Sequence, residues 1–204
     1  MDRRAFFRRG LKEVAEVAVK HADAQACGRA ERWIRPPYAL AELEFLLSCT
    51  RCGECAAACP HGVVFPLPAR LGAQVMGTPA LDLLNKGCHL CEDWPCVVAC
   101  EPEALRLPEA DEEEAPRPPP RIAVASIDTR SCLPYSGPEC GACAASCPVP
   151  GALFWTGERP RIDPGLCTGC ALCREACIVE PSAIHIHSLH RYPEGDVDPP
   201  TNTA

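Results

Sequence analysis

Apolar residues near the N-terminus recur with the period of an α-helix. They stand three or four positions apart, at Phe7, Leu11, Val14, Ala18 and Ala22. This spacing predicts an amphipathic helix over roughly residues 4–26. The sequence Arg35-Pro36-Pro37 interrupts the pattern, and residues 39–47 predict a second, shorter helix after it.

Further along the chain, apolar residues come in brief runs rather than in long periodic segments. The runs cover residues 62–67, 104–107, 122–127, 151–155 and 183–186. β-Branched residues in the first and last runs, and in 122–127, predict short strands. No run reaches the roughly 18 apolar residues of a membrane-spanning helix, so the pattern excludes one. Short helices mixed with short strands predict a small α+β fold.

The composition shows that apolar packing alone cannot hold this chain together. Aromatic residues make up only 5% of the 204 residues, whereas cysteine occurs 17 times. A chain this poor in large apolar side chains needs inorganic or covalent support for its core. The formal net charge of −7 argues against nucleic acid as a partner, because phosphate binding calls for a basic surface.

Sixteen of the cysteines fall into four groups of four, and Cys27 stands alone. The first two groups are Cys49, Cys52, Cys55, Cys59 and Cys88, Cys91, Cys96, Cys100. The last two are Cys132, Cys140, Cys143, Cys147 and Cys167, Cys170, Cys173, Cys177. The first and fourth groups have spacers of two, two and three residues, and proline stands at or just after the end of the first three groups.

Three kinds of cysteine chemistry compete for these groups. Three thiols spaced two residues apart would be strained as pairwise disulfides. Zinc favours paired C-x2-C units and gives no reason for a further cysteine three residues on. A [4Fe–4S] cube takes three thiolates from a C-x2-C-x2-C loop, while the next cysteine reaches a second cube. The spacing therefore predicts four [4Fe–4S] clusters bound by all sixteen grouped cysteines.

Because the fourth cysteines cross over, the groups are expected to work in pairs, and the spacing allows two arrangements. Neighbouring groups can pair, or the first can pair with the fourth around the second and third. An acidic, proline-rich linker at residues 109–120 separates the first two cysteine groups from the last two. This division favours the pairing of neighbouring groups. The predicted organisation is an N-terminal helical extension (1–47), two cysteine-bearing segments (48–108 and 121–190), this linker between them, and a disordered tail (191–204).

The extreme N-terminus allows two cellular locations. Arg3-Arg4 followed by Ala5-Phe6 is similar to a twin-arginine export motif. An export signal also needs an apolar core, and here charged residues interrupt the segment from Lys12 onwards. The favoured prediction is a cytoplasmic protein whose basic helix packs on its own domain or docks on a partner, with periplasmic export from Arg3-Arg4 as the alternative.

Several motifs resemble known ferredoxin-type accessory proteins. The segments 47–55 and 132–140, with Arg35 to Tyr38, are similar to the cytoplasmic ferredoxin-type protein of periplasmic nitrate reductase. The segments 77–96 and 167–184 resemble the exported ferredoxin-type proteins of nitrate reduction and methylamine utilisation. The C-x2-C-x3-Pro-C block also recurs in iron–sulfur subunits of molybdopterin oxidoreductases. The resemblance covers about residues 35–188.

The resemblance implies a redox accessory protein made of two halves like bacterial ferredoxins, each with two [4Fe–4S] clusters. Its function would be electron transfer to or from a partner oxidoreductase. The alternative is an assembly factor that docks on an apo-metalloenzyme and supports loading of its metal centre. No nucleophile, general base or substrate pocket can be assembled from the other residues, so no catalytic site is expected.

The resemblance to the oxidoreductase subunits also implies the nested pairing of the groups. One cube would take Cys49, Cys52, Cys55 and Cys177, and its neighbour Cys167, Cys170, Cys173 and Cys59. The other two would take Cys88, Cys91, Cys96 and Cys147, and Cys132, Cys140, Cys143 and Cys100.

Residues beside the cysteines are expected to support the clusters. Glycines inside the cysteine loops let the backbone curl close to a cube, at Gly53, Gly141 and Gly169. Tryptophans are expected to cover clusters from water, at Trp33, Trp94 and Trp155. Cys27 is expected to be a small buried residue of the N-terminal helix.

Overall fold

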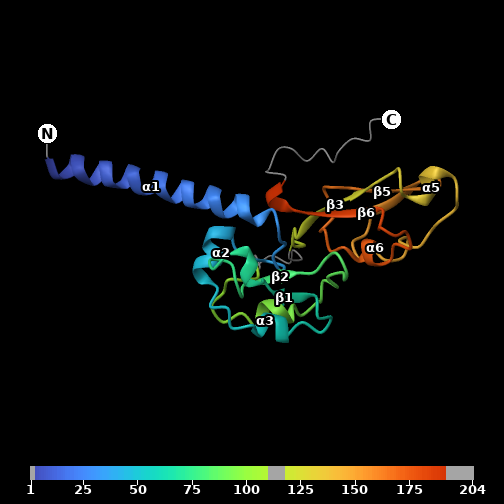
Figure 1. Cartoon of the computed structure of the whole chain (residues 1–204), viewed down its shortest axis with the longest axis horizontal. Helices are drawn as coiled ribbons and strands as arrows, with labels where there is room; N and C mark the ends of the chain where they lie inside the picture. Colours follow the sequence, from blue (N-terminus) through green and yellow to red (C-terminus); the bar gives the residue numbers. More distant parts are fainter. Residues whose placement is uncertain (1–2, 110–117, 192–204) are drawn as a thin grey trace.

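The N-terminal helix is present in the computed structural model, which describes residues 3–109 and 118–191. It is α1 (Arg3–Ala30), and it ends beyond the predicted boundary near residue 26. Figure 1 shows it projecting away from the rest of the molecule. Val14 and Val17 are 68% and 67% exposed, and only Ala26 and Ala30 are buried among its described side chains. From Val14 to Ala22 the apolar side chains of the helix therefore lack cover from the described chain.

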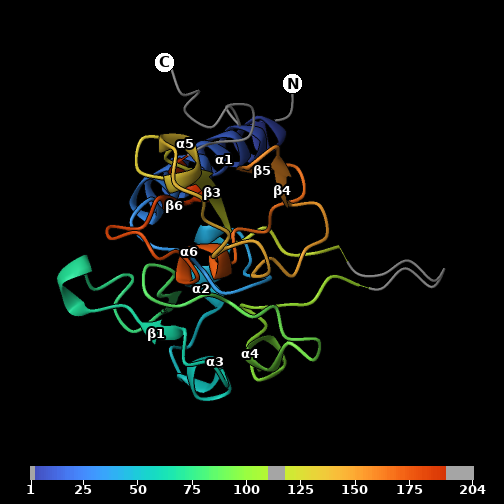
Figure 2. The same ribbon diagram turned by 90° about the vertical axis from the view of Figure 1, so that its right-hand side faces the viewer.

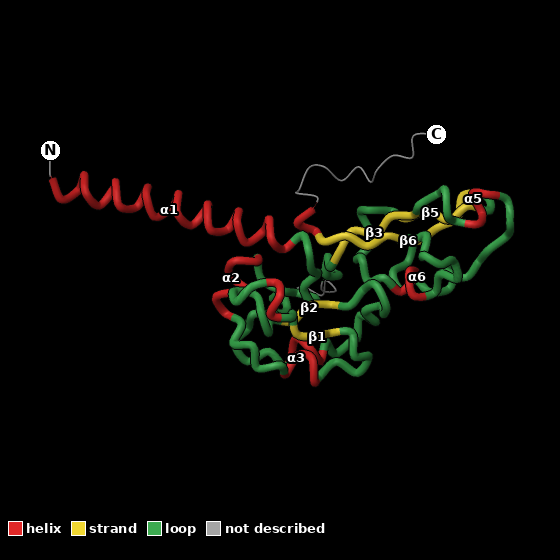
Figure 3. Tube along the Cα trace, viewed as in Figure 1, coloured by secondary structure: helices red, strands yellow, loops and turns green. Residues whose placement is uncertain are grey.

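The N-terminal cysteine segment contains several short elements. Its helices are α2 (Glu42–Ser48), α3 (Glu54–Ala57), α4 (Pro95–Val98) and the 3-10 turn η1 (Ala69–Leu71). Its strands β1 (Val64–Pro66) and β2 (Pro79–Leu81) pair antiparallel, with Val64 opposite Leu81. Loops make up most of this segment, as the tube in Figure 3 shows.

The C-terminal cysteine segment has two antiparallel strand pairs. Strand β3 (Ala123–Ile127) pairs with β6 (Ile184–Ser188), and β4 (Leu153–Thr156) pairs with β5 (Arg159–Ile162). The helices here are α5 (Leu133–Ser136), α6 (Leu172–Glu175) and the 3-10 turn η2 (Leu189–Arg191). The predicted strands at 122–127 and 183–186 are therefore confirmed. Within the described ranges, no helix is both long and apolar enough to cross a membrane.

The two cysteine segments share one topology, which is complete in the C-terminal segment and has fewer paired residues in the N-terminal segment. In the C-terminal segment β3 and β6 form an outer pair around the inner pair β4–β5. In the N-terminal segment β1–β2 is the inner pair, and a single bridge between Ala39 and Leu105 takes the place of the outer pair. The apolar run at 104–107 thus forms only this bridge, because prolines at 36, 37 and 108 remove the donors that would extend it.

One apolar core joins both segments, and cysteine is part of it. The core extends from Phe45 through the strands to Ile186, and it includes five buried cysteines: Cys55, Cys88, Cys96, Cys170 and Cys173. A second, smaller core contains Ala30 and Trp33, where the end of α1 meets the N-terminal segment. Figure 2 shows helices α2 and α6, one from each segment, near the middle of the molecule. The thiols therefore occupy positions that large apolar side chains fill in other proteins.

A buried ion pair fastens the segment that follows α1 to the N-terminal segment. Arg35 donates to both carboxylate oxygens of Glu42, at 2.9 and 2.6 Å, and also to Thr78 Oγ1 and the Pro79 carbonyl. Trp33 Nε1 donates to Glu42 at 3.2 Å. The Arg35 and Glu42 side chains are 8% and 0% exposed. Because every charged atom has a partner, the pair fixes the chain path into the first cysteine group.

The change Glu42→Gln is expected to destabilise the protein by about 3 kcal/mol, because it leaves the Arg35 charge buried without its counter-ion. The matched control is Glu103→Gln, which breaks an exposed pair to Arg106 and should change stability by less than about 0.5 kcal/mol. Denaturant unfolding of the two variants under anaerobic conditions checks the difference. Equal effects of the two changes would show that the buried pair does not anchor this region.

Candidate metal centres

The structure gathers the sixteen grouped cysteines into four sites, and the first spans most of the N-terminal segment. Site 1 consists of Cys49, Cys52, Cys55 and Cys100. Burial, together with the nearby sulfurs of Cys100, Cys49 and Cys52, raises the pKa of Cys55 to about 11. Burial also raises the pKa of Cys49, again with Cys100 and Cys52 contributing. Cys100 therefore joins the three cysteines of the first loop.

The other three sites each surround a cavity. Site 2 is Cys59, Cys88, Cys91 and Cys96, which line one cavity. Site 3 is Cys132, Cys140, Cys143 and Cys177, which line another. Site 4 is Cys147, Cys167, Cys170 and Cys173, which line the third. The identical donor sets indicate that the three cavities accept the same kind of group.

The nested pairing is wrong for this structure, and neighbouring groups pair instead. Cys100 lies in site 1 and Cys59 in site 2, so the first and second groups exchange their last cysteines. Cys177 lies in site 3 and Cys147 in site 4, so the third and fourth groups do the same. The reason is topological: the strand pairs fold each segment back on itself and bring its own two groups together. The linker at 109–120 pointed to this arrangement, although residues 110–117 lie outside the described residues.

Backbone N–H groups in the cysteine loops point to the sulfurs. The N–H of Arg51 donates to Cys49, and the N–H of Gly169 donates to Cys167, which lowers the pKa of each thiol against the larger effect of burial. Both donors stand just before the second cysteine of a C-x2-C loop and have positive φ, 62° and 75°. Leu90 repeats this conformation in the second loop, with φ of 49°. The left-handed residue turns the N–H toward the sulfur.

The three loop glycines singled out by sequence are not equivalent. Gly53 and Gly169 have φ of 84° and 75°, a region that favours glycine. A Cβ on Gly169 would also lie only 2.1 Å from the carbonyl oxygen of Ala123 in β3, whereas Gly53 has open space. Gly141 has neither positive φ nor a close neighbour. The predicted role fits Gly169 best and does not fit Gly141.

Single metal ions and disulfides do not suit these sites. None of the 17 cysteines forms a disulfide. In the described part of the chain, no three His, Cys, Asp or Glu side chains converge closely enough to hold one metal ion. Thiols spread around a cavity are what a polyatomic cluster needs, whereas a zinc site gathers its sulfurs about 2.3 Å from one centre. The donor chemistry therefore fits iron–sulfur clusters.

One polar atom at a cavity also fits such a cluster. Trp155 Nε1 is buried, with no hydrogen-bond partner in the described part of the chain. Trp155 lines the cavity of site 3. A buried N–H without an acceptor is costly, and cluster sulfur is an acceptor. The indole would hold a cluster by a hydrogen bond, in addition to the four thiolates of that site.

Burial keeps the thiols of Cys96 and Cys173 protonated until iron binds. Burial raises the pKa of Cys96 and of Cys173 to about 12, with neighbouring cysteines adding to the effect. Iron binds the thiolate, so loading a site must release protons from these residues. When bound, the iron would supply a one-electron redox couple, and the protein would set its potential through burial and hydrogen bonds to sulfur.

The change Trp155→Phe is expected to lower the reduction potential of a cluster in site 3, because a donor N–H favours the more negative, reduced state. The expected shift is on the order of 40 mV, corresponding to about 1 kcal/mol for one hydrogen bond. Redox titration followed by EPR measures it. Trp94→Phe is the control, since Trp94 lines site 2 and should leave the site 3 potential unchanged. An unshifted potential in Trp155→Phe would show that the indole does not donate to the cluster.

Two other sequence predictions have different outcomes. Trp33 lies in the small core below α1 and lines none of the cavities of sites 2 to 4, so it does not cover a cluster there. Cys27 is half-buried on α1, and burial, together with the nearby Asp23 carboxylate, raises the pKa of its thiol. A raised pKa makes the thiol less reactive, in agreement with a packing role.

Comparisons with known proteins agree with this donor set. The chain is 32% identical over 199 residues to the methylamine utilization ferredoxin-type protein MauM of Methylobacillus flagellatus, covering 91% of this chain and 83% of that protein. The chain belongs to this ferredoxin-type family. It is also 32% identical over 168 residues to the ferredoxin-type protein NapF of Escherichia coli, covering 80% of this chain and 90% of NapF.

A further member of the family is longer than this ferredoxin-type protein. The ferredoxin-type protein NapG of Haemophilus influenzae is 34% identical over 167 residues, which cover 75% of this chain and 58% of NapG. No protein-family profile matches the chain, and no solved structure matches it. The ferredoxin-type names of these relatives support an iron–sulfur electron-transfer role.

Proposed function

We propose that this ferredoxin-type protein holds one [4Fe–4S] cluster in each of sites 1 to 4 and passes single electrons to or from a partner oxidoreductase. The observation that carries the proposal is the sorting of sixteen cysteines into four complete sets of four. Each set combines three cysteines of one sequence group with one from its neighbour, the arrangement typical of paired [4Fe–4S] clusters. Segments 48–108 and 121–190 are then two halves like bacterial ferredoxins.

The remaining segments serve the partner in this proposal. The exposed positions of α1, such as Val14 and Val17, are the surface offered to the partner enzyme. The five basic residues among positions 3–12 place positive charge on that helix, whereas the chain as a whole is acidic. The proposed location is the cytoplasm, which fractionation of cells can test against export.

A coulometric redox titration of the iron-loaded protein tests the function. Four clusters that each accept one electron should give about four electrons per chain, taken up and released reversibly. The Cys27→Ser variant should give the same number, because Cys27 lies outside all four sites. A protein that binds iron but exchanges no electrons would overturn the carrier function and point instead to an assembly factor.

A further inference from the structure

The two cysteine segments meet at cluster ligands. The backbone N–H of Cys88, in site 2, donates to the carbonyl of Cys170, in site 4, at 2.7 Å. Sites 2 and 4 therefore face each other across the boundary between the segments.

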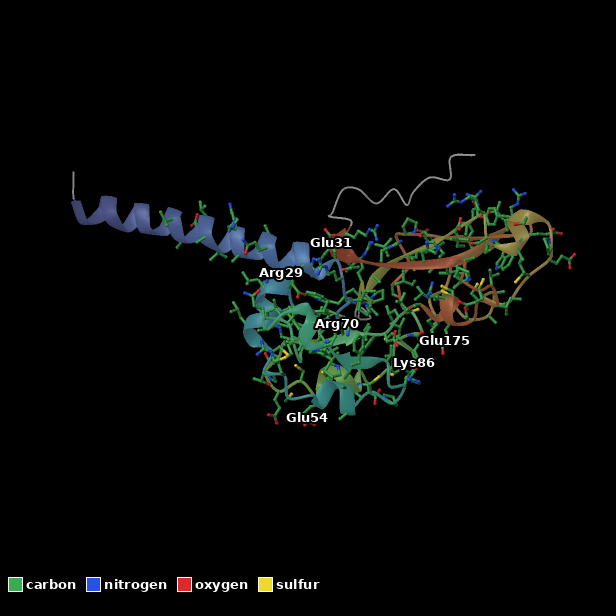
Figure 4. The ribbon with its side chains drawn as sticks, viewed as in Figure 1. Arg29, Glu31, Glu54, Arg70, Lys86 and Glu175 are labelled. Atoms are coloured by element: carbon green, nitrogen blue, oxygen red, sulfur yellow. The ribbon has the colours of Figure 1, made fainter. Side chains whose placement is uncertain are left out.

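The packing beside this hydrogen bond permits no side chain at residue 87. A Cβ on Gly87 would lie 2.6 Å from Leu172 Cδ2 and 2.9 Å from Leu172 Cα. The N–H of Gly87 donates to Glu175 Oε2 at 2.8 Å, and Arg174 donates to the Leu84 carbonyl at 3.2 Å. Figure 4 shows the labelled Glu175 and Lys86 at this boundary. Leu84 and Gly87 of one segment are thus held against α6 of the other.

Within each segment the sites are also adjacent. Cys55 of site 1 and Cys59 of site 2 stand one helical turn apart at α3, and Cys96 of site 2 and Cys100 of site 1 do so at α4. Cys173 of site 4 and Cys177 of site 3 stand one turn apart at α6. These positions and the Cys88–Cys170 hydrogen bond connect site 1 to site 2, site 2 to site 4, and site 4 to site 3.

We infer that electrons cross between the segments at the Cys88–Cys170 contact, so that the clusters form one path in the order site 1, site 2, site 4, site 3. The inference rests on the proposed function and specifies its route. Electron tunnelling slows steeply with distance, so the path follows the adjacent sites rather than the order of the cysteine groups in sequence. Gly87 acts as a positioning residue, because its missing side chain lets the ligand-bearing loops touch.

EPR of fully reduced, iron-loaded full-length variants tests this order. The first variant keeps sites 2 and 4, through Cys49→Ala, Cys52→Ala, Cys132→Ala and Cys140→Ala. The second keeps sites 1 and 4, through Cys88→Ala, Cys91→Ala, Cys132→Ala and Cys140→Ala. Each should retain about eight iron atoms. The first should show a spectrum split by spin–spin coupling, and the second should show two isolated signals.

The first variant overturns the inference if its spectrum is the sum of two isolated signals while its iron is retained. Should either variant lose its iron, Gly87→Ala and Gly141→Ala in the otherwise natural chain decide the matter. Gly87→Ala should weaken the coupling with about 16 iron atoms retained, and Gly141→Ala should leave it unchanged. Unchanged coupling in Gly87→Ala contradicts the inferred junction. A natural chain that binds no iron would instead overturn the proposed function.

Discussion

Replacing Cys100 by alanine is expected to remove the cluster of site 1, although Cys100 lies 41 residues beyond the last cysteine of the first group in the sequence. The reason is that Cys100 joins Cys49, Cys52 and Cys55 in the structure. Loss of one ligand from a cube opens one iron to solvent and makes the cluster labile. Iron content should fall from about 16 to about 12 atoms per chain.

Double variants turn this expectation into a test of the pairing. Cys100→Ala combined with Cys52→Ala removes two ligands of one site, so iron should stay near 12 atoms per chain. Cys100→Ala combined with Cys140→Ala removes ligands of sites 1 and 3, so iron should fall to about eight. The nested pairing predicts the opposite, because there Cys100 and Cys140 share a cube. Iron analysis of the purified proteins decides between the two.

Replacing Gly169 by alanine is expected to prevent site 4 from forming. The added Cβ would meet the Ala123 backbone, with the carbonyl carbon at 2.4 Å and the nitrogen at 2.6 Å, and neither atom can move without displacing β3. The positive φ of Gly169 adds about 1–2 kcal/mol of strain for any residue with a Cβ. The total loss of folding stability should exceed about 3 kcal/mol, and the chain should bind about four fewer iron atoms.

Two other glycines provide graded controls for this change. Gly53→Ala meets no neighbour but has positive φ, so it should cost only about 1–2 kcal/mol. Gly141 has neither a close neighbour nor a positive φ, so Gly141→Ala should change the free energy of unfolding by less than about 0.5 kcal/mol. Thermal unfolding and iron analysis of the three variants give the order. Equal losses in all three would show that the backbone contact with Ala123 is not what requires glycine.

The N-terminal helix and the outer strands could be predicted because their signals are local. The helical spacing from Phe7 onwards and the β-branched run at 122–127 each belong to one element. Strands β2 and β5 were missed, since Pro79 and the sequence Arg159-Pro160-Arg161-Ile162 lack strand signals. Pairing with β1 and β4 makes these segments extended, and no local pattern reports such pairing.

The sequence was enough to predict which cysteines form the candidate sites, but not which of them share a site. The spacing identified which sixteen cysteines gather, because three ligands of a cube come from one short loop. The fourth ligand depends on how distant strands fold, and for Cys100 and Cys177 the resemblance gave the wrong partners. The orphaned indole of Trp155 could not be foreseen either, since nothing local shows that its N–H lacks an acceptor.

Iron and acid-labile sulfide analysis of the anaerobically purified protein, with EPR of its reduced form, tests the central claim most directly. Four [4Fe–4S] clusters require about 16 iron and about 16 sulfide per chain, with signals from reduced cubes. Four clusters need sixteen thiolate ligands, and sites 1 to 4 supply that number only when all sixteen grouped cysteines take part. A colourless protein, one that contains zinc in place of iron, or one with far fewer than 16 iron atoms would contradict the account.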